Sequence, residues 1–129
     1  MATKDVISTD RAPGPFQGAP YNQAIRVGDL VFVAGQLGIS RETGELAGGG
    51  VSEQTEQIME NLGAILEAAG SGLDRLLKTT VFLVDLADFG AMNEVYAKHV
   101  GDRPPARSTV GISQLPSGAR VEIEAIAHI

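Results

Sequence analysis

The sequence predicts an α+β fold, a mixed β-sheet with two helices packed on one face. Runs with apolar residues at every second position, or with nearly continuous β-branched residues, are typical of strands. Two amphipathic stretches with helical spacing interrupt these runs. Along the chain the order is strands, helix, strand, helix, strands, which favours the α+β class.

The N-terminal third is expected to contain a lead-in and a hairpin. Residues 1–18 are rich in Pro and Gly and predict an irregular segment with a short strand at 6–8. The apolar runs 24–27 and 30–34 predict two strands. Gly28-Asp29 between them is a two-residue hairpin signal.

Two helices and one strand are expected in the middle of the chain. Apolar spacing predicts a helix over 53–69, with Ser52 as N-cap and Gly70 just past its end. The β-branched run 79–86 predicts a strand that is covered on both faces. Asp88 is expected to cap a second helix. The predicted buried side of that helix consists of Phe89, Met92, Val95, Tyr96 and Val100.

These elements leave one face of the sheet without a cover. Two helices can cover only one face of a sheet of about five or six strands. The run 79–86 carries apolar side chains toward the other face as well. Because the chain offers no third layer, we expect a homo-oligomer that packs these faces together.

The last two strands carry the most informative polar residues. After Pro104-Pro105, period-two alternation places Arg107 on the less apolar face of a strand. In the run 121–127, Glu122 and Glu124 share one face. If the two strands are neighbours, a guanidinium and a carboxylate point into one cleft, a site for a small anionic substrate. A cross-strand ion pair, contributing about 0.2–1 kcal/mol, explains the same residues equally well.

Composition excludes several function classes. The 129 residues, expected to form one domain over 1–129, carry a net charge of −6, which argues against a nucleic-acid partner. There is no Cys, so a zinc knuckle or thiolate nucleophile is excluded. His99 and His128 lack metal-ligand spacing and are expected on the surface. No stretch predicts a signal peptide or membrane span, so a cytoplasmic protein is expected.

Ten short motifs occur in order between Pro20 and Ala127, and together they resemble the RidA family, also known as YjgF/YER057c/UK114. They are Pro20-Tyr21-Asn22-Gln23-Ala24, Phe32-Val33-Ala34-Gly35-Gln36, Thr43-Gly44-Glu45, Glu53-Gln54-Thr55, Asn61-Leu62, Lys78-Thr79-Thr80-Val81-Phe82-Leu83, Asp88-Phe89, Met92-Asn93, Pro105-Ala106-Arg107-Ser108 and Val121-Glu122-Ile123-Glu124-Ala125-Ile126-Ala127.

The resemblance implies a chorismate-mutase-like fold and a homotrimer whose sheets form a central β-barrel, with sites between subunits. It implies hydrolysis of 2-imino acids such as 2-iminobutanoate and 2-iminopropanoate to 2-oxo acids and ammonia. No metal and no organic cofactor is required by that reaction. Alternatives within the family are an endoribonuclease or translation inhibitor, a holdase chaperone, and a divergent member acting on another small carboxylate.

The resemblance also assigns roles to residues of this sequence. Arg107 matches the position that binds the substrate carboxylate, for which its fixed fork of donors is suited. Glu122 matches the water-positioning glutamate and is the expected general base. Backbone groups at Gly35 are expected to hold the reacting centre, while Tyr21 and Asn93 match pocket-lining positions.

Two substrate-binding positions depart from the family pattern. Many deaminases carry serine where this chain has Ala34, and often cysteine where it has Thr109. The alanine removes one hydroxyl that would otherwise bond to substrate or water. A slower reaction, a narrower substrate range and a divergent subgroup all remain open, although the retained Arg107 argues against an inactive member.

Overall fold

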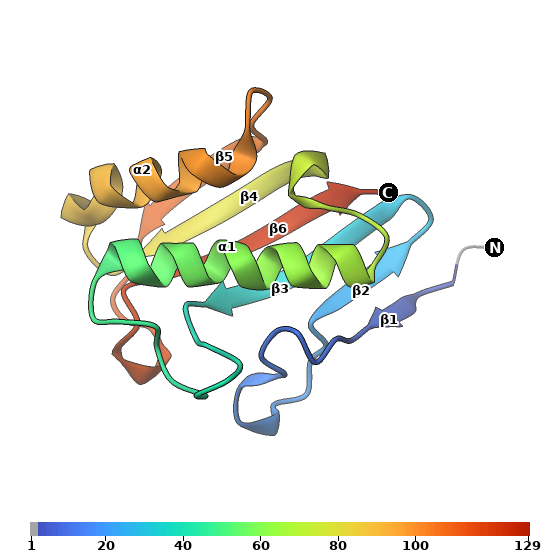
Figure 1. Ribbon diagram of the computed structural model, residues 1–129, viewed down its shortest axis with the longest axis horizontal. Coiled ribbons are helices and arrows are strands. Elements are labelled where there is room, and N and C mark those ends of the chain that lie inside the picture. The colour runs from blue at the N-terminus through green and yellow to red at the C-terminus, as the bar shows by residue number, and fades with distance from the viewer. Residues whose placement is uncertain (1–2) are drawn as a thin grey trace.

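The computed structural model describes residues 3–129 and contains one mixed sheet of six strands with the order β1-β2-β3-β6-β4-β5. Both long helices lie on the same face of this sheet (Figure 1). The strands are β1 Asp5–Ile7, β2 Ala24–Val27, β3 Leu30–Leu37, β4 Leu76–Leu83, β5 Ala106–Gly111 and β6 Val121–His128, and the helices are α1 Val51–Ala68 and α2 Phe89–Val100. The predicted α+β class with two helices on one face is confirmed.

Strand β6 occupies the centre of the sheet and carries much of the core. It pairs antiparallel with both β3 and β4, whereas β4 and β5 are parallel. Its residues Val121, Ile123 and Ala127 are fully buried beneath the helices. The alternate residues Glu122 and Glu124 therefore point to the opposite face, which confirms that the two carboxylates share a face.

The face opposite the helices is apolar in part and open. Leu30, Phe32 and Val110 are 39%, 42% and 41% exposed. Each alternates with residues that face the helices, so all three lie on the open face. Among residues 3–129 no helix packs against them. No helix in this part of the chain has the length and hydropathy needed to cross a bilayer.

The bounds of β1 and β4 differ from the predicted ranges. Strand β1 begins at Asp5 instead of at residue 6. Strand β4 spans Leu76–Leu83, so the predicted range 79–86 was wrong at both ends. A register shift between Leu76 and Lys78 disturbs the alternation at its start. At its end the Asp85 carboxylate accepts the Ala87 N–H (2.9 Å) and begins a 3₁₀ turn, although the apolar run continues.

The hairpin between β2 and β3 agrees with the prediction. Gly28 adopts a φ of 58°, the left-handed conformation that such a tight turn requires. Strand β3 continues to Leu37, three residues beyond the predicted range 30–34. The lead-in, predicted as irregular over 1–18, contains the 3₁₀ turn Phe16–Gly18; Met1 and Ala2 lie outside the described residues.

The ends of α1 are only partly as predicted. The helix begins at Val51 with Gly50 as N-cap, so Ser52 is not the cap. The Glu53 carboxylate accepts the Gly50 N–H (3.3 Å) and takes over the capping role that a serine hydroxyl would have had. Gly70, just past the C-cap, has a φ of 86°, as its predicted position requires.

Helix α2 exposes one residue that was predicted to be buried. Met92, Tyr96 and Val100 are buried, but Phe89 is 42% exposed, and Val95 is half-buried. Asp88 is the N-cap residue as predicted, yet its side chain makes no cap hydrogen bond.

Two polar contacts tie α2 to its surroundings. The Asp88 carboxylate binds the Arg120 guanidinium at 2.8 Å and so ties the start of α2 to the start of β6. The predicted surface residue His99 is half-buried and contacts Glu56 of α1.

Gln54 of α1 holds the loop between β3 and α1 in place. Its buried amide donates to the Gly48 carbonyl (2.9 Å) and accepts the Arg120 N–H (2.8 Å). A buried amide that satisfies both of its groups fixes the segments that it joins, because losing either bond would leave a buried polar group unpaired. The loop and the start of β6 are thus held at a defined distance.

Gly38→Ala should lower stability because the loop backbone lies directly on α1. A Cβ at Gly38 would lie 2.6 Å from the Cα and carbonyl oxygen of Gln54, so backbone must move. We expect a loss of about 1–3 kcal/mol in the free energy of unfolding. Urea unfolding at fixed protein concentration measures it. Gly49→Ala, where a Cβ meets nothing within 4 Å, is the matched control; equal stability of the two variants would contradict the prediction.

Candidate active site

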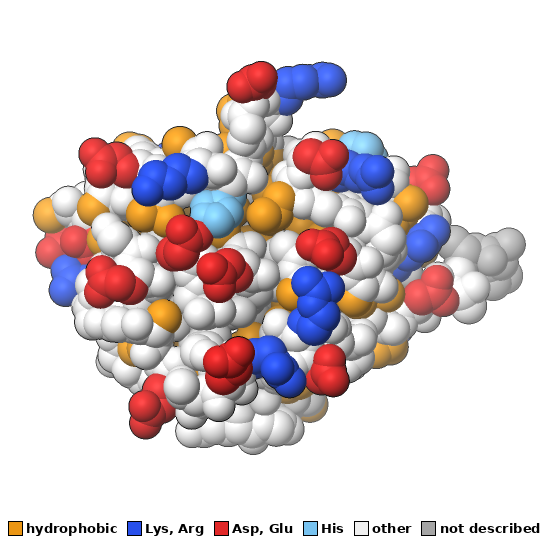
Figure 2. All heavy atoms as spheres, in the orientation of Figure 1, with side chains coloured by type: hydrophobic (Ala, Val, Ile, Leu, Met, Phe, Trp, Pro, Cys, Tyr) orange, Lys and Arg blue, Asp and Glu red, His pale blue; other side chains and the backbone are white. Residues whose placement is uncertain are grey.

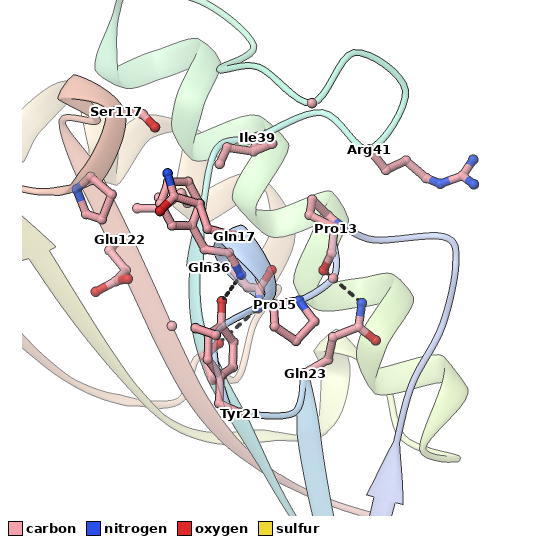
Figure 3. Close-up of a pocket in the computed structure, with 18 of the residues that line it drawn as sticks. Pro13, Pro15, Gln17, Tyr21, Gln23, Gln36, Ile39, Arg41, Ser117 and Glu122 are labelled. Carbon is pink, nitrogen blue, oxygen red and sulfur yellow. Dashed lines mark hydrogen bonds between the residues drawn. The ribbon is translucent and has the colours of Figure 1, made fainter.

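A cavity of about 910 Å³ opens on the side of the sheet where β3 ends and β6 begins. Its walls come from four segments that are distant in the sequence: the lead-in, the end of β3, the loop that follows it and the turn before β6 (Figure 3). Tyr21, Ala34, Gly35 and Glu122 all line this cavity, so four of the predicted site residues lie together.

Glu122 reaches the cavity because β3 bulges opposite to it. The register between β3 and β6 shifts between Val33 and Gln36. A Cβ at Gly35 would lie 2.8 Å from the Glu122 carboxyl carbon, so the missing side chain provides the space that the carboxyl group fills. Burial, and then the charge of Glu124, raise the pKa of Glu122 above the usual carboxyl range.

Tyr21 is fixed through its hydroxyl. The oxygen accepts the Phe16 N–H at 2.6 Å, which ties the ring to the lead-in turn. Gln17 in this turn has a φ of 53°, a conformation that only a well-held turn imposes on a residue other than glycine. The Tyr21 O–H proton is left to act as a donor.

Gln23 orders the lead-in, although the sequence predicted no role for it. Its buried amide donates to the Pro13 carbonyl at 2.8 Å, drawn as a dashed line in Figure 3. The same side chain accepts the Thr9 N–H at 2.7 Å. The segment is therefore a fixed wall of the cavity, and the description of it as an irregular lead-in was incomplete.

Ala34 presents no polar side chain, and its backbone groups are already occupied. Its N–H donates to the Gln23 carbonyl (3.0 Å), and its carbonyl accepts from the Gln36 amide (3.1 Å). The cavity wall at this position is apolar. Any hydrogen bond to a bound molecule here must come from the neighbouring residues.

Arg107 lies elsewhere, between β5 and α2. Its guanidinium carbon lies over two aromatic rings, 4.9 Å from the centroid of Tyr96 and 5.5 Å from that of Phe89. The Tyr96 hydroxyl shares a 2.7 Å hydrogen bond with the buried Thr79 hydroxyl of β4. Burial raises the pKa of Tyr96, against the opposing effects of the Thr79 bond and the Arg107 charge.

Asn93 and Thr109 belong to the same group of residues as Arg107. Asn93 follows Phe89 by four residues and precedes Tyr96 by three, so it lies on the same side of α2. Thr109 lies two residues after Arg107 and thus on the same face of β5. Within the described residues, the Asn93 Oδ1 and Thr109 Oγ1 atoms are buried without a hydrogen-bond partner. Both are thus unsatisfied polar atoms on the faces of α2 and β5 that carry this group.

Arg107 and Glu122 do not meet in one chain, because the condition stated for a shared cleft, that their strands are neighbours, is not met. Strand β4 lies between β5 and β6. Arg107 pairs with Thr79, whose side chain faces α2, while Glu122 faces the open side. The cross-strand ion pair considered as an alternative is excluded within the chain for the same reason. The candidate residues therefore form two separate groups.

Sequence reasoning missed part of both groups. Phe89 and Tyr96 were predicted only as core residues, and Ser117 was not singled out. The available signal was a repeated turn, Gln17-Gly18-Ala19 and Ser117-Gly118-Ala119, in which both Gln17 and Ser117 have positive φ. Both turns line the cavity. Within residues 3–129, no three His, Asp or Glu side chains gather as metal ligands would.

Comparison with known proteins places the chain in a family. The endoribonuclease L-PSP family model matches residues 11–129. A RutC family protein of Pyrococcus abyssi is 50% identical over 97% of each chain. The 2-iminobutanoate/2-iminopropanoate deaminase of Mus musculus is 44% identical, over 96% of this chain and 90% of that protein. E. coli TdcF with bound serine has a TM-score of 0.88 at 40% identity, over 97% of this chain and 98% of that one. The chain therefore belongs to the endoribonuclease L-PSP family, the RidA family that its motifs resemble.

Proposed function

We propose that this protein hydrolyses 2-imino acids to 2-oxo acids and ammonia, in sites shared between neighbouring subunits of a homotrimer. One observation carries the proposal: the Arg107 group, which is suited to bind a carboxylate, and the Glu122 group, which is suited to activate water, lie in the same chain but face apart. A small substrate can touch both only if two copies of the chain supply one group each. The deaminase name of a relative, and serine bound to another, agree with this substrate class.

The open face of the sheet supports an oligomer. Leu30, Phe32 and Val110 project from it and are each about two-fifths exposed. Apolar side chains grouped on one face are typical of a surface that packs against another protein. A second copy of the same face meets this requirement, and closing three sheets around an axis produces the barrel that the family resemblance implies.

Arg107 is suited to bind the carboxylate of the substrate. Its guanidinium is always charged and presents two parallel N–H donors, which match the two oxygens of a carboxylate. Hydrogen bonds to such charged groups contribute on the order of 1.5–3 kcal/mol each. Asn93 and Thr109, on the same faces of α2 and β5, carry buried oxygens that have no hydrogen-bond partner within the described residues. The carboxylate is thereby held in one orientation, with the C=N carbon next to it directed toward the other group.

Glu122 is suited to the hydrolytic step. A water molecule adds to the C=N carbon of the protonated imine while the carboxylate takes its proton. The tetrahedral intermediate then carries one hydroxyl and one amino group. Glu122 returns the proton to nitrogen and so becomes a carboxylate again. As the C–N bond breaks, this carboxylate takes the hydroxyl proton, the C=O bond of the 2-oxo acid forms, and ammonia leaves; the ammonia then takes up that proton as ammonium and frees Glu122 for the next turnover. A carboxyl whose pKa is raised toward neutrality performs these transfers more readily than an ordinary glutamate.

The surface charge is unfavourable for a polyanion such as RNA. The chain carries a net charge of −6. On the face that bears the helices, Asp and Glu side chains are spread over the surface with Lys and Arg among them (Figure 2). Binding of nucleic acid draws its affinity from clustered basic residues. The Arg107 and Glu122 groups therefore support small-molecule hydrolysis over cleavage of RNA.

Arg107→Ala and Arg107→Lys should each abolish most of the activity. Lysine keeps the charge but loses the paired donors, so we expect a loss of at least about tenfold in kcat/KM for both variants. Release of 2-oxo acid from freshly generated 2-iminobutanoate and 2-iminopropanoate, with buffer alone subtracted, measures it. Near-normal activity of the lysine variant would contradict the role given to the guanidinium fork.

Mixing two inactive variants tests whether sites are shared. Arg107→Ala and Glu122→Gln chains, unfolded and refolded together in equal amounts, should recover about a quarter of wild-type activity. Each shared site takes Arg107 from one chain and Glu122 from the neighbouring chain. Half of the chains carry an intact Arg107 and half an intact Glu122, so about one site in four has both. Each variant refolded alone is the control. Absence of recovery in mixed trimers would show that each site lies within one chain.

The acid limb of the pH–activity profile should reflect Glu122. Only the carboxylate form accepts a proton, so kcat/KM should fall as the pH drops through a pKa above the ordinary value of 4.5. Glu124→Gln removes a like charge, so the Glu122 pKa should fall and the acid limb should move to lower pH. Glu60→Gln, an exposed change on α1, is the control. An acid limb that stays at the same pH in the Glu124→Gln variant would contradict the effect of Glu124 on the pKa of Glu122.

A further inference from the structure

The surroundings of Arg107 contain more than a binding group requires. Two aromatic rings from one side of α2 lie within 5.5 Å of its guanidinium carbon. Phe89 and Tyr96 are seven residues apart, two turns of the helix, and both face β5. An arginine over ring faces is held by the attraction between its charge and the π-electrons.

One of the two rings is itself anchored. The Tyr96 hydroxyl shares a hydrogen bond of 2.7 Å with Thr79, which is fully buried in β4. Thr79 is also the register partner of Arg107 in the neighbouring strand. Thr79 therefore fixes Arg107 in two ways. It is the strand partner of the Arg107 backbone, and it holds the ring that the Arg107 side chain contacts. Phe89, at the first position of α2, is 42% exposed.

We propose that Phe89 and Tyr96 are positioning residues that fix the direction of the Arg107 guanidinium, with Thr79 holding the Tyr96 ring. The inference rests on the proposed function, because it explains how Arg107 presents its paired donors to the substrate carboxylate. Within residues 3–129, no Asp or Glu side chain forms an ion pair with Arg107. A long side chain without such a partner otherwise samples many rotamers, and ordering it reduces the binding free energy.

The arrangement has a consequence for kinetics. The carboxylate is bound in both the ground state and the transition state, so looser positioning of Arg107 should mainly raise KM. The hydrolytic step depends on the Glu122 group, which is on the other face of the sheet. Loss of one ring should therefore change KM by a larger factor than kcat, whereas a general loss of folded protein would lower the apparent kcat and leave KM unchanged.

Phe89→Leu tests the exposed ring, and Phe89→Tyr is the matched control. Leucine keeps an apolar side chain but lacks the π-face, so KM for 2-iminobutanoate should rise about tenfold with kcat within about threefold. Tyrosine keeps the ring and should restore KM to within about twofold of wild type. Equal KM values for the leucine variant and wild type would overturn the proposal for Phe89.

Tyr96→Phe tests the anchored ring without removing it. The variant keeps the π-face and loses the hydrogen bond to Thr79, so a smaller rise in KM, about threefold, is expected. The double variant Tyr96→Phe/Thr79→Val removes both polar groups and leaves no buried hydroxyl unpaired. It should resemble Tyr96→Phe in KM. A double variant with wild-type KM would show that the anchor has no part in positioning Arg107.

A measurement that needs no substrate separates this proposal from the proposed function. The Nε–Hε group of Arg107, assigned by the loss of its signal in Arg107→Lys, should be ordered in the free wild-type protein. Its NMR order parameter should drop to below about 0.6 in Phe89→Leu. If wild type lacks deaminase activity, the proposed function fails and this measurement alone decides the positioning role. An unchanged order parameter overturns the positioning role whatever the activity.

Discussion

The position of β6 between β3 and β4 determines how the rest of the molecule is arranged. Because this strand returns to the centre of the sheet, the chain's last two strands are separated by β4. The carboxylate of Glu122 then faces the open side, while β5 at the edge turns Arg107 toward α2. Only a strand order in which β5 and β6 are neighbours would allow the two charges to share a cleft within one chain. The sheet topology therefore divides the candidate site into two groups.

Close backbone approach is the second constraint on the site. The carboxyl of Glu122 occupies the space where a side chain at Gly35 would lie, and the backbone of α1 occupies the space beside Gly38. Both glycines lie within four residues, at the point where β3 leaves the sheet. Glycine is needed at both positions because a Cβ would collide with these neighbours, and not because the backbone adopts an unusual φ. The end of β3 can thus lie against β6 on one side and α1 on the other, which brings the cavity wall to the carboxylate of Glu122.

The sequence allowed prediction of periodic features and of the family, but not of spatial neighbours. Alternation in the last strand placed Glu122 and Glu124 on one face, and the positive φ of Gly28 and Gly70 followed from their positions. Strand β4 was misplaced because a register shift hides its start and an apolar Leu86 follows its end. Phe89 was assigned to the core because helical spacing does not reveal that its partner is a cation. The strand order depends on packing between distant segments, which periodicity does not contain.

Separation of the two charges within a chain has a chemical rationale. If Arg107 paired with Glu122, the cation would hold the pKa of Glu122 low and the carboxylate would occupy the donors of Arg107. Instead burial and Glu124 raise the pKa of Glu122, and the guanidinium of Arg107 lies over the rings of Phe89 and Tyr96. In the arrangement proposed above, two copies of the chain would place the substrate's own carboxylate at Arg107 and its C=N carbon near Glu122. On that proposal the substrate separates the two protein charges, so Arg107 keeps its free guanidinium and Glu122 keeps its raised pKa.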